Sequence, residues 1–311
     1  MSQVADTLPD EGGLVVYDVS LVPDDPPDEL LYRHRPDILR SARELLHRSE
    51  VIYTLTERDI KAQYKQQVLG IGWALLTPLI NLFFLTIVFR HVKAANVGPG
   101  VPFILSTYVA LLTWGLFGGA IGGGSNSLVS NKALMAKSHF PRECFPLSQI
   151  LGSAFTSLIG LVPLFILFGA EGFVPRAETI WVPLYLAVEV VFTVGIVLAI
   201  SAIIVQMRDL QQLIPIVIPL AMLATVLIPF STAFHHPFGP NTNYFVHGWV
   251  RSFWCVVNPL VPVIDNVRGS VLFGVGPNWH TMSLAACGSV AYLVGGYALF
   301  KRLEVNFADL S

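Results

Sequence analysis

Charged residues are scarce in this sequence of 311 residues: Asp, Glu, Lys and Arg together make up 13% of it. A soluble globular domain carries about a quarter. Hydrophobic residues reach 53%, and the mean hydropathy is +0.62. With apolar runs of about twenty residues, this composition indicates that lipid is the solvent for most of the chain. The net charge of −2 says little about partners, because the charges lie in short segments outside the bilayer, and nucleic acid is not expected among them.

Cysteine is also rare. The three residues Cys144, Cys255 and Cys287 are an odd number and lack the spacing of metal ligands, so we predict neither a disulfide nor a metal site. Clustered carboxylates are missing as well, and Asp265 stands almost alone on the predicted outer side. A membrane-embedded glycosyltransferase or phosphotransferase would need such a cluster or a metal ion. We therefore predict no catalytic residue and a protein that is not an enzyme.

A phosphate-binding motif of the form G-x-x-x-x-G-K-[ST] is absent, so the chain is not expected to hydrolyse ATP by that route. The stretch most similar to that motif contains six glycines in a predicted span: Gly115, Gly118, Gly119, Gly122, Gly123 and Gly124. No Lys-Ser or Lys-Thr follows them. Glycines four apart let helix backbones approach closely in lipid, and we interpret the run as a helix-packing face.

What the sequence does contain is a series of apolar stretches long enough for helices that cross roughly 30 Å of hydrocarbon. We predict an all-α polytopic membrane protein with six transmembrane helices. The predicted spans are residues 73–92, 103–129, 148–169, 181–205, 212–232 and 281–300. An even number of spans places both termini on one side. If that side is cytoplasmic, fourteen of the 19 basic residues lie inside, as the positive-inside rule requires.

The residues before the first span divide into two parts. Residues 1–35 combine acid and proline and are predicted to be a disordered cytoplasmic tail. Residues 36–70 turn helical, with Tyr53, Ile60, Tyr64 and Val68 on one face, and the basic residues Arg58, Lys61 and Lys65 lie in a narrow arc away from it. We predict an amphipathic helix in the membrane surface, with its basic side toward lipid phosphates. The alternative is an ordinary amphipathic helix packed on protein.

Two further segments interrupt the transmembrane domain, which we assign to residues 71–311. The region 244–275 contains two apolar pieces that are broken at Asn258-Pro259 and are too short to cross comfortably, so we predict a re-entrant pair. The cytoplasmic segment 130–146 carries Leu134 and Met135 between basic residues. Exposed apolar residues of this kind suit docking into a cleft on a cytosolic partner. The alternative is a positively charged turn that only sets the topology.

Glu189 is the one carboxylate well inside a predicted span, and an ionisable group in that position suggests a functional role by default. It has no charged partner on the same helix. We favour a structural pair or a snorkelling position over a polar cavity or proton coupling. The adjacent His235 and His236 lack further ligands, and we assign them no role.

Five separated landmarks resemble the membrane permeases of type-2 ABC exporters, in the branch that exports polysaccharides such as O-antigen or teichoic acid. The resemblance runs from about residue 50 to the C-terminus. The landmarks are Arg58 to Lys65 followed by Leu69-Gly70 and Trp73, then Asn131 to Arg142, Arg208-Asp209, Asn258-Pro259-Leu260 with Pro262 and Arg268, and Phe300 to Glu304.

The resemblance implies a homodimeric channel in the bacterial plasma membrane, with two copies of a separate cytosolic ABC ATPase that binds ATP and Mg. Segment 130–146 would be the coupling helix that docks the ATPase, through Asn131, Lys132, Leu134, Met135, Lys137, Phe140 and Arg142. The surface helix would be the gate helix, with Arg58, Lys61, Tyr64 and Lys65 near lipid headgroups. The re-entrant pair would line the outer exit, through Asn258, Pro259, Pro262, Asp265 and Arg268. The implied substrate is a glycan on a polyprenyl diphosphate, and the alternative is a small lipid or drug.

Overall fold

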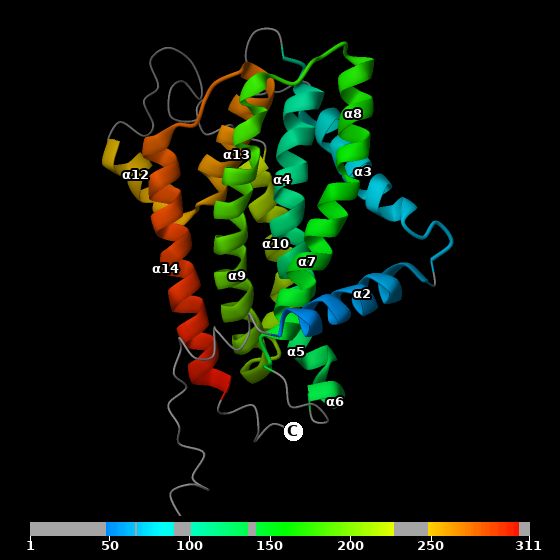
Figure 1. The fold of residues 1–311 in the computed structure, drawn as a ribbon, viewed down its shortest axis with the longest axis vertical. Helices are drawn as coiled ribbons and strands as arrows, with labels where there is room; N and C mark the ends of the chain where they lie inside the picture. Colours follow the sequence, from blue (N-terminus) through cyan, green and yellow to red (C-terminus); the bar gives the residue numbers. More distant parts are fainter. Residues whose placement is uncertain (1–47, 66, 90–100, 136–140, 227–247, 305–311) are drawn as a thin grey trace, which may run out of the picture.

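The computed structural model describes residues 48–65, 67–89, 101–135, 141–226 and 248–304, and all regular structure within them is helical (Figure 1). Most of the longer helices run along the long axis of the molecule, and α2 (Ser49–Lys65) crosses it obliquely near one end. The predicted tail, residues 1–35, lies outside the described residues. The predicted all-α class is confirmed for the part of the chain that the structure describes.

Four helical stretches are long and apolar enough to cross a membrane. They are α4 (Phe103–Gly124), α7 with α8 (Cys144–Ile159 and Leu161–Ala170), η3 with α9 (Ala177–Trp181 and Val182–Gln206), and α14 (Trp279–Glu304). Two apolar helices are shorter: α3 (Gly72–Phe89) and α10 (Leu210–Val226). At 1.5 Å per residue, each covers about 26 Å of the roughly 30 Å needed. The predicted spans 73–92 and 212–232 continue beyond the described residues, so the count of six stays a prediction.

The main apolar core surrounds α4, whose side chains Leu105, Tyr108 and Ala110 are fully buried. Figure 1 shows α4 in the middle of the bundle, between α7, α9 and α10. A second, smaller cluster lies near the end that carries α5 (Ser127–Ser130) and α6 (Lys132–Met135). Its buried members come from four helices and a short turn of helix: Leu55, Leu128, Cys144, Phe145, Leu198, Ala202 and Phe300.

Glycines allow two close helix contacts. In α4, a Cβ atom added at Gly123 would lie 2.6 Å from Oε1 of Gln149, and one added at Gly119 would lie 3.0 Å from Oγ of Ser153, both on α7. The packing interpretation of this run is confirmed there. The second contact was not anticipated: Gly195 of α9 and Gly296 of α14 meet so closely that an added Cβ would run into backbone. The sequence signal is weak, because the two glycines are 101 positions apart and each stands among apolar residues.

At the end of the molecule opposite α6 lie two short helices, α12 (Gly248–Val257) and α13 (Leu260–Arg268). The chain breaks between them at Asn258 and Pro259, where a broken pair was predicted, and α13 continues into a π-helical turn, Gly269–Phe273. Residues 244–247 lie outside the described residues. The re-entrant placement of this pair in a bilayer stays a prediction.

Candidate functional site

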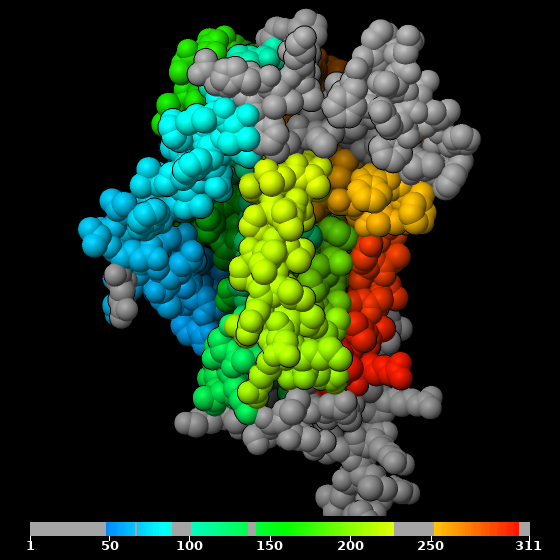
Figure 2. Space-filling view, turned by 180° about the vertical axis from the view of Figure 1, so that it is seen from behind, coloured from blue at the N-terminus to red at the C-terminus, as the bar shows by residue number. Residues whose placement is uncertain are grey.

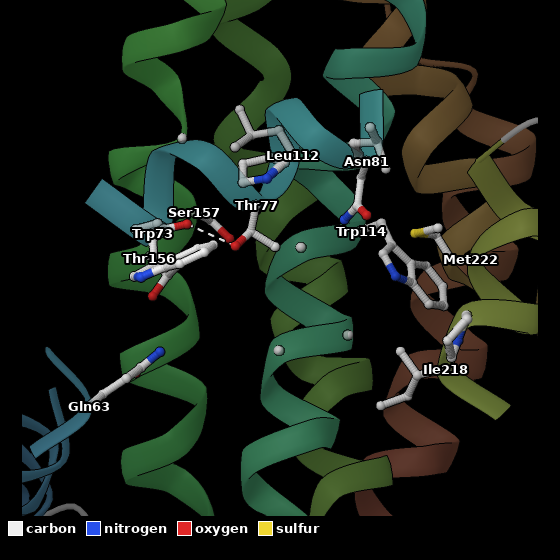
Figure 3. A pocket seen from close by; sticks show the side chains of 18 of the residues that line it. Gln63, Trp73, Thr77, Asn81, Leu112, Trp114, Thr156, Ser157, Ile218 and Met222 are labelled. Atoms are coloured by element: carbon white, nitrogen blue, oxygen red, sulfur yellow. Dashed lines mark hydrogen bonds between the residues drawn. The ribbon is translucent and has the colours of Figure 1, made fainter. Parts of the chain in front are cut away.

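A cavity of about 620 Å³ opens between α3, α4, α7 and α10, beside the C-terminal end of α2. Figure 2 shows the surface hollowed at this place, between α10 and the side formed by α2 and α3. Figure 3 shows the side chains around it: Trp73, Thr77 and Asn81 from α3, Trp114 from α4, Thr156 and Ser157 from α7, and Ile218 and Met222 from α10. Its lining contains indole rings, hydroxyls and amides and no ionised side chain.

The glycines of α4 create this space. Gly115, Gly118 and Gly119 line the cavity, and a side chain at any of them would project toward it or toward α7. A second cavity of about 450 Å³ adjoins the first and shares Gln63, Gly115, Gly119 and Thr156 with it. The two together follow the glycine face of α4 toward Gly123. The same residues that permit close helix packing therefore also leave a polar path open.

The second cavity is bounded by α2, which a polar seam holds against α7. The Oδ2 atom of Asp59 accepts hydrogen bonds from Nε2 of Gln149 at 2.6 Å and from Oγ of Ser148 at 3.2 Å. Further along, the hydroxyls of Tyr64 and Thr156 lie 3.3 Å apart. Tyr64 was expected near lipid headgroups. The structure places it half-buried in this seam, and its contact with lipid stays a prediction. On this side, α2 therefore fits the alternative given for it from the sequence, an amphipathic helix packed on protein.

The basic residues of α2 have separate environments. Arg58 donates from Nη2 to Oδ1 of Asn131 at 2.8 Å and also contacts the carboxylate of Asp59. Lys61 is exposed and pairs with Glu57 one turn earlier, which raises the pKa of Lys61 above its usual value. Lys65 is exposed. The structure thus brings Arg58 to the predicted coupling segment and leaves the two lysines on the surface.

The predicted coupling segment is only partly described. Within α6, Lys132 and Ala133 are exposed, whereas Leu134 and Met135 are half-buried against the cluster that contains Phe145 and Phe300. Beyond the helix, Arg142 donates to the carbonyl oxygen of Glu304 at 2.9 Å. Lys137 and Phe140 lie outside the described residues. The two apolar side chains predicted to dock a partner therefore contribute first to the chain's own packing.

The sequence profile of the ABC-2 type transporter family matches residues 50–240, which is more than half of the chain and includes both cavities' helices α2, α3, α4, α7 and α10. This chain belongs to the ABC-2 type transporter family. The family consists of transport permeases, so the expectation that the protein is not an enzyme agrees with its membership. Family membership and the apolar helices together make it a multi-pass membrane protein.

Relatives of this ABC-2 transporter match along nearly their whole length. It is 26% identical over 273 residues to the O-antigen export system permease protein RfbA of Myxococcus xanthus, covering 88% of this chain and 99% of the relative. It is also similar to two proteins of that name from Klebsiella pneumoniae, at 24% and 22% identity over 262 residues, covering 84% of this chain and 95% of each relative.

In this ABC-2 transporter the predicted outer residues are mostly buried rather than open to a passage. Arg268 is 4% exposed, and its guanidinium donates to the carbonyl of Ser106 at 3.0 Å and to the carbonyl of Val226. These contacts tie α13 to α4 and α10. Pro262 is buried, and Asn258 and Asp265 are half-buried. Pro259 is the residue from which α13 begins.

Glu189 is fully buried in α9, so a snorkelling position is wrong. Neither carboxylate oxygen has a hydrogen-bond partner among the described residues, and the expected structural pair is not seen there.

Two polar contacts that the structure shows were not singled out from the sequence. One is made by Asp59 on α2, and the other is the pair of Glu143 with Lys301. The available signal was charge at predicted span ends, since Glu143 and Lys301 each flank an apolar run.

Proposed function

We propose that this chain is the channel-forming subunit of an ATP-driven exporter that moves a polyprenyl-diphosphate-linked polysaccharide across the bacterial plasma membrane. Similarity to permeases named for O-antigen export, over 84% to 88% of the chain, supports the substrate class. Membership in the ABC-2 family supports a separate ABC ATPase as the partner, with ATP and Mg bound there.

The chemistry of the cavity lining carries the proposal. A sugar unit offers hydroxyl groups around its edge and apolar C–H faces above and below its ring. Gln63, Asn81 and Thr156 supply neutral donors and acceptors for the hydroxyls, and Trp73 and Trp114 supply flat apolar surfaces. Asp59 is the one ionised side chain in the lining of either cavity, and neither lining contains a cation. The path therefore suits neutral sugars, and the diphosphate would stay near the exposed Lys61 and Lys65.

The proposed assembly uses the apolar faces beside the cavity. On α3, Phe83 and Phe84 are 62% and 60% exposed, and on α10, Ile216 and Leu220 are 60% and 61% exposed. A second copy of the chain would close the open side of the cavity there, and the rest of the apolar surface would face membrane lipid. Two ATPase copies would bind at the end that carries α6. That end would be cytoplasmic, and both termini would lie on the same side of the membrane.

A glycine substitution tests this function. Leucine at Gly115 would fill part of the cavity, and its Cβ would make only ordinary van der Waals contact, with Oγ of Ser157 at 3.6 Å. Gly169→Leu is the matched control, because nothing lies within 4 Å of that Cβ and the residue does not line either cavity. In vesicles with the cognate ATPase, Gly115→Leu should block translocation of a lipid-linked glycan, and Gly169→Leu should not. Normal glycan export by Gly115→Leu would contradict the proposal, and export of small lipids alone by the unchanged complex would favour the alternative substrate.

A further inference from the structure

The last turn of α14 is bound to the end of the coupling segment by a buried polar network. Glu143, fully buried at the start of α7, pairs with Nζ of Lys301, which also contacts Oε2 of Glu304 at 2.9 Å. Tyr297 donates to Glu143 at 3.4 Å, and Arg142 donates to the carbonyl of Glu304. The network joins residues that are more than 150 positions apart. If one partner were removed, a charge would be left uncompensated in the interior.

From this network α14 runs as one helix of 26 residues without an internal proline, a length of about 39 Å. Its backbone lies directly against α9 where Gly296 meets Gly195. Because α14 is helical throughout and lacks a proline, a usual cause of a sharp kink, we take it to move as a unit. Displacement of its cytoplasmic end is therefore passed along its axis.

Higher on α14, a second set of contacts reaches α12. The hydroxyl of Tyr292 donates to the carbonyl of Val257 at 2.9 Å. One turn earlier, Gly288 lies against the carbonyl of Val256, and a Cβ atom there would collide with it. Val257 is the last residue of α12, immediately before the break at Asn258 and Pro259. Helix α14 thus holds the residue next to the break.

The other side of the break is held by α4 and α10 in addition to the start of α14, where Asn266 of α13 donates to the hydroxyl of Thr281 at 3.5 Å. Arg268 in α13 is bonded to the carbonyls of Ser106 in α4 and Val226 in α10. Movement of α14 relative to α4 and α10 would therefore carry α12, whereas α13 would be held back by its bonds to α4 and α10. The angle between the two short helices would change at Asn258-Pro259.

We propose that α14 transmits the movement of the coupling segment to α12, through the Glu143–Lys301 pair at its cytoplasmic end and the Tyr292 hydroxyl at its outer contact. This inference rests on the proposed function, since the movement originates in an ATPase docked at α6. It assigns a role to Phe300–Glu304, a landmark that the sequence alone left without one, and it adds a hinge to the outer-exit role expected of Asn258-Pro259. Glu143, Lys301 and Tyr292 are positioning residues, because none of them is required to touch the substrate.

The experiment uses two cysteine reporters in a chain whose native cysteines are replaced. One is Phe253→Cys on α12, where the side chain is 61% exposed, and the other is Tyr53→Cys on α2, where it is 69% exposed. The complex with its ATPase is purified in detergent and labelled with a maleimide, with and without ATP and orthovanadate. In the unchanged background we expect both labelling rates to change by at least about fivefold, the lower range of coupling between distant sites.

Tyr292→Phe removes the outer contact and keeps the aromatic ring, which packs on Phe192 at 5.0 Å. Its matched control is Tyr108→Phe, which removes a hydroxyl that donates to the carbonyl of Gly160 over the same 2.9 Å. We expect Tyr292→Phe to reduce the response at α12, where the contact of Gly288 with Val256 remains, and to preserve the response at α2. Tyr108→Phe should preserve both. Lys301→Met should have the same effect as Tyr292→Phe. Because Lys301→Met could misfold, the result for Tyr292→Phe alone decides the test.

A full α12 response in Tyr292→Phe would overturn the inference while leaving the proposed function intact. Absence of any response at either reporter in the unchanged background would instead overturn the proposed function, and the transmission route with it. Loss of both responses in Tyr292→Phe, with the ATPase still bound, would also contradict the route, because α2 does not depend on this contact.

Discussion

Arg58 in α2 donates a hydrogen bond to Asn131 over 2.8 Å, although the two residues are 73 positions apart. Arg58 also bonds Asp59, which in turn is held by Ser148 and Gln149 of α7. The guanidinium therefore joins the predicted gate helix to Asn131, near the start of the predicted coupling segment. The Arg58 side chain is 42% exposed, so the contact lies at the surface and contributes little to stability. Its importance is that it fixes the position of the two segments relative to each other.

The first prediction concerns this geometry. Arg58→Lys keeps the charge but replaces a planar fork by a point charge, so it cannot bond Asp59 and Asn131 in the same way. We expect partial loss of glycan export, with expression and ATPase association unchanged, and a larger loss for Arg58→Ala. The comparison is Lys61→Ala, which removes an exposed charge that pairs with Glu57 and whose attraction to anionic lipid or to the diphosphate contributes about 1 kcal/mol. Equal effects of Arg58→Ala and Lys61→Ala, with normal export by Arg58→Lys, would show that general charge suffices.

The coupling segment leads to a second prediction. Changing both Leu134 and Met135 to Asp should abolish export, but because both pack against Phe145 and Phe300, part of the loss should come from the permease itself. We expect Leu134→Asp alone to lower the free energy of unfolding by about 1–3 kcal/mol, seen as a lower Tm of the isolated chain. Ala133→Asp, on the exposed side of α6, should leave the Tm unchanged and weaken co-purification of the ATPase. Retention of the ATPase in all three variants would remove this segment from docking.

A third prediction tests the contact between α9 and α14. In Gly296→Ala the added methyl group would meet the backbone of Gly195, which cannot move aside as a flexible side chain can. Overpacking of this kind costs about 1–3 kcal/mol, so the Tm measured in detergent should fall. Gly295→Ala is the neighbouring control, since nothing lies within 4 Å of its Cβ, and it should leave the Tm unchanged. Similar Tm values for the two variants would show that the helices separate easily at this point.

The fourth prediction concerns Glu189, whose buried carboxyl has no hydrogen-bond partner among the described residues. An ionised carboxylate in such a place is costly, so an uncharged side chain of the same shape should be tolerated there. Glu189→Gln is uncharged and preserves the shape, and it should insert and export within about twofold of the unchanged chain. Glu189→Lys should fail to accumulate in the membrane, because a cation there has nothing to pair with in the part of the chain described. Loss of export in a well-folded Glu189→Gln would instead indicate that the carboxyl must exchange a proton.

Local properties of the sequence determined the class of protein and the position of its elements. Apolar runs such as 103–129 can be recognised from the sequence because a helix in lipid forms all its backbone hydrogen bonds within itself. Length and composition alone therefore indicate a span. The break at Asn258-Pro259 followed from the conformational limits of proline. The resemblance of separated landmarks to ABC-2 permeases pointed to the family in the same way, through residues read one segment at a time.

Only the tertiary structure decided which segments meet. Amphipathicity placed Tyr64 on a lipid-facing side of α2, yet its hydroxyl lies beside Thr156, because periodicity identifies a face but not what covers it. The Glu143–Lys301 pair and the Gly195–Gly296 contact each join helices far apart in the chain. In lipid, helices associate through close packing and polar contacts and not through a general exclusion of apolar surface. Their partners therefore depend on the shape of both surfaces at once, which no single segment of the sequence contains.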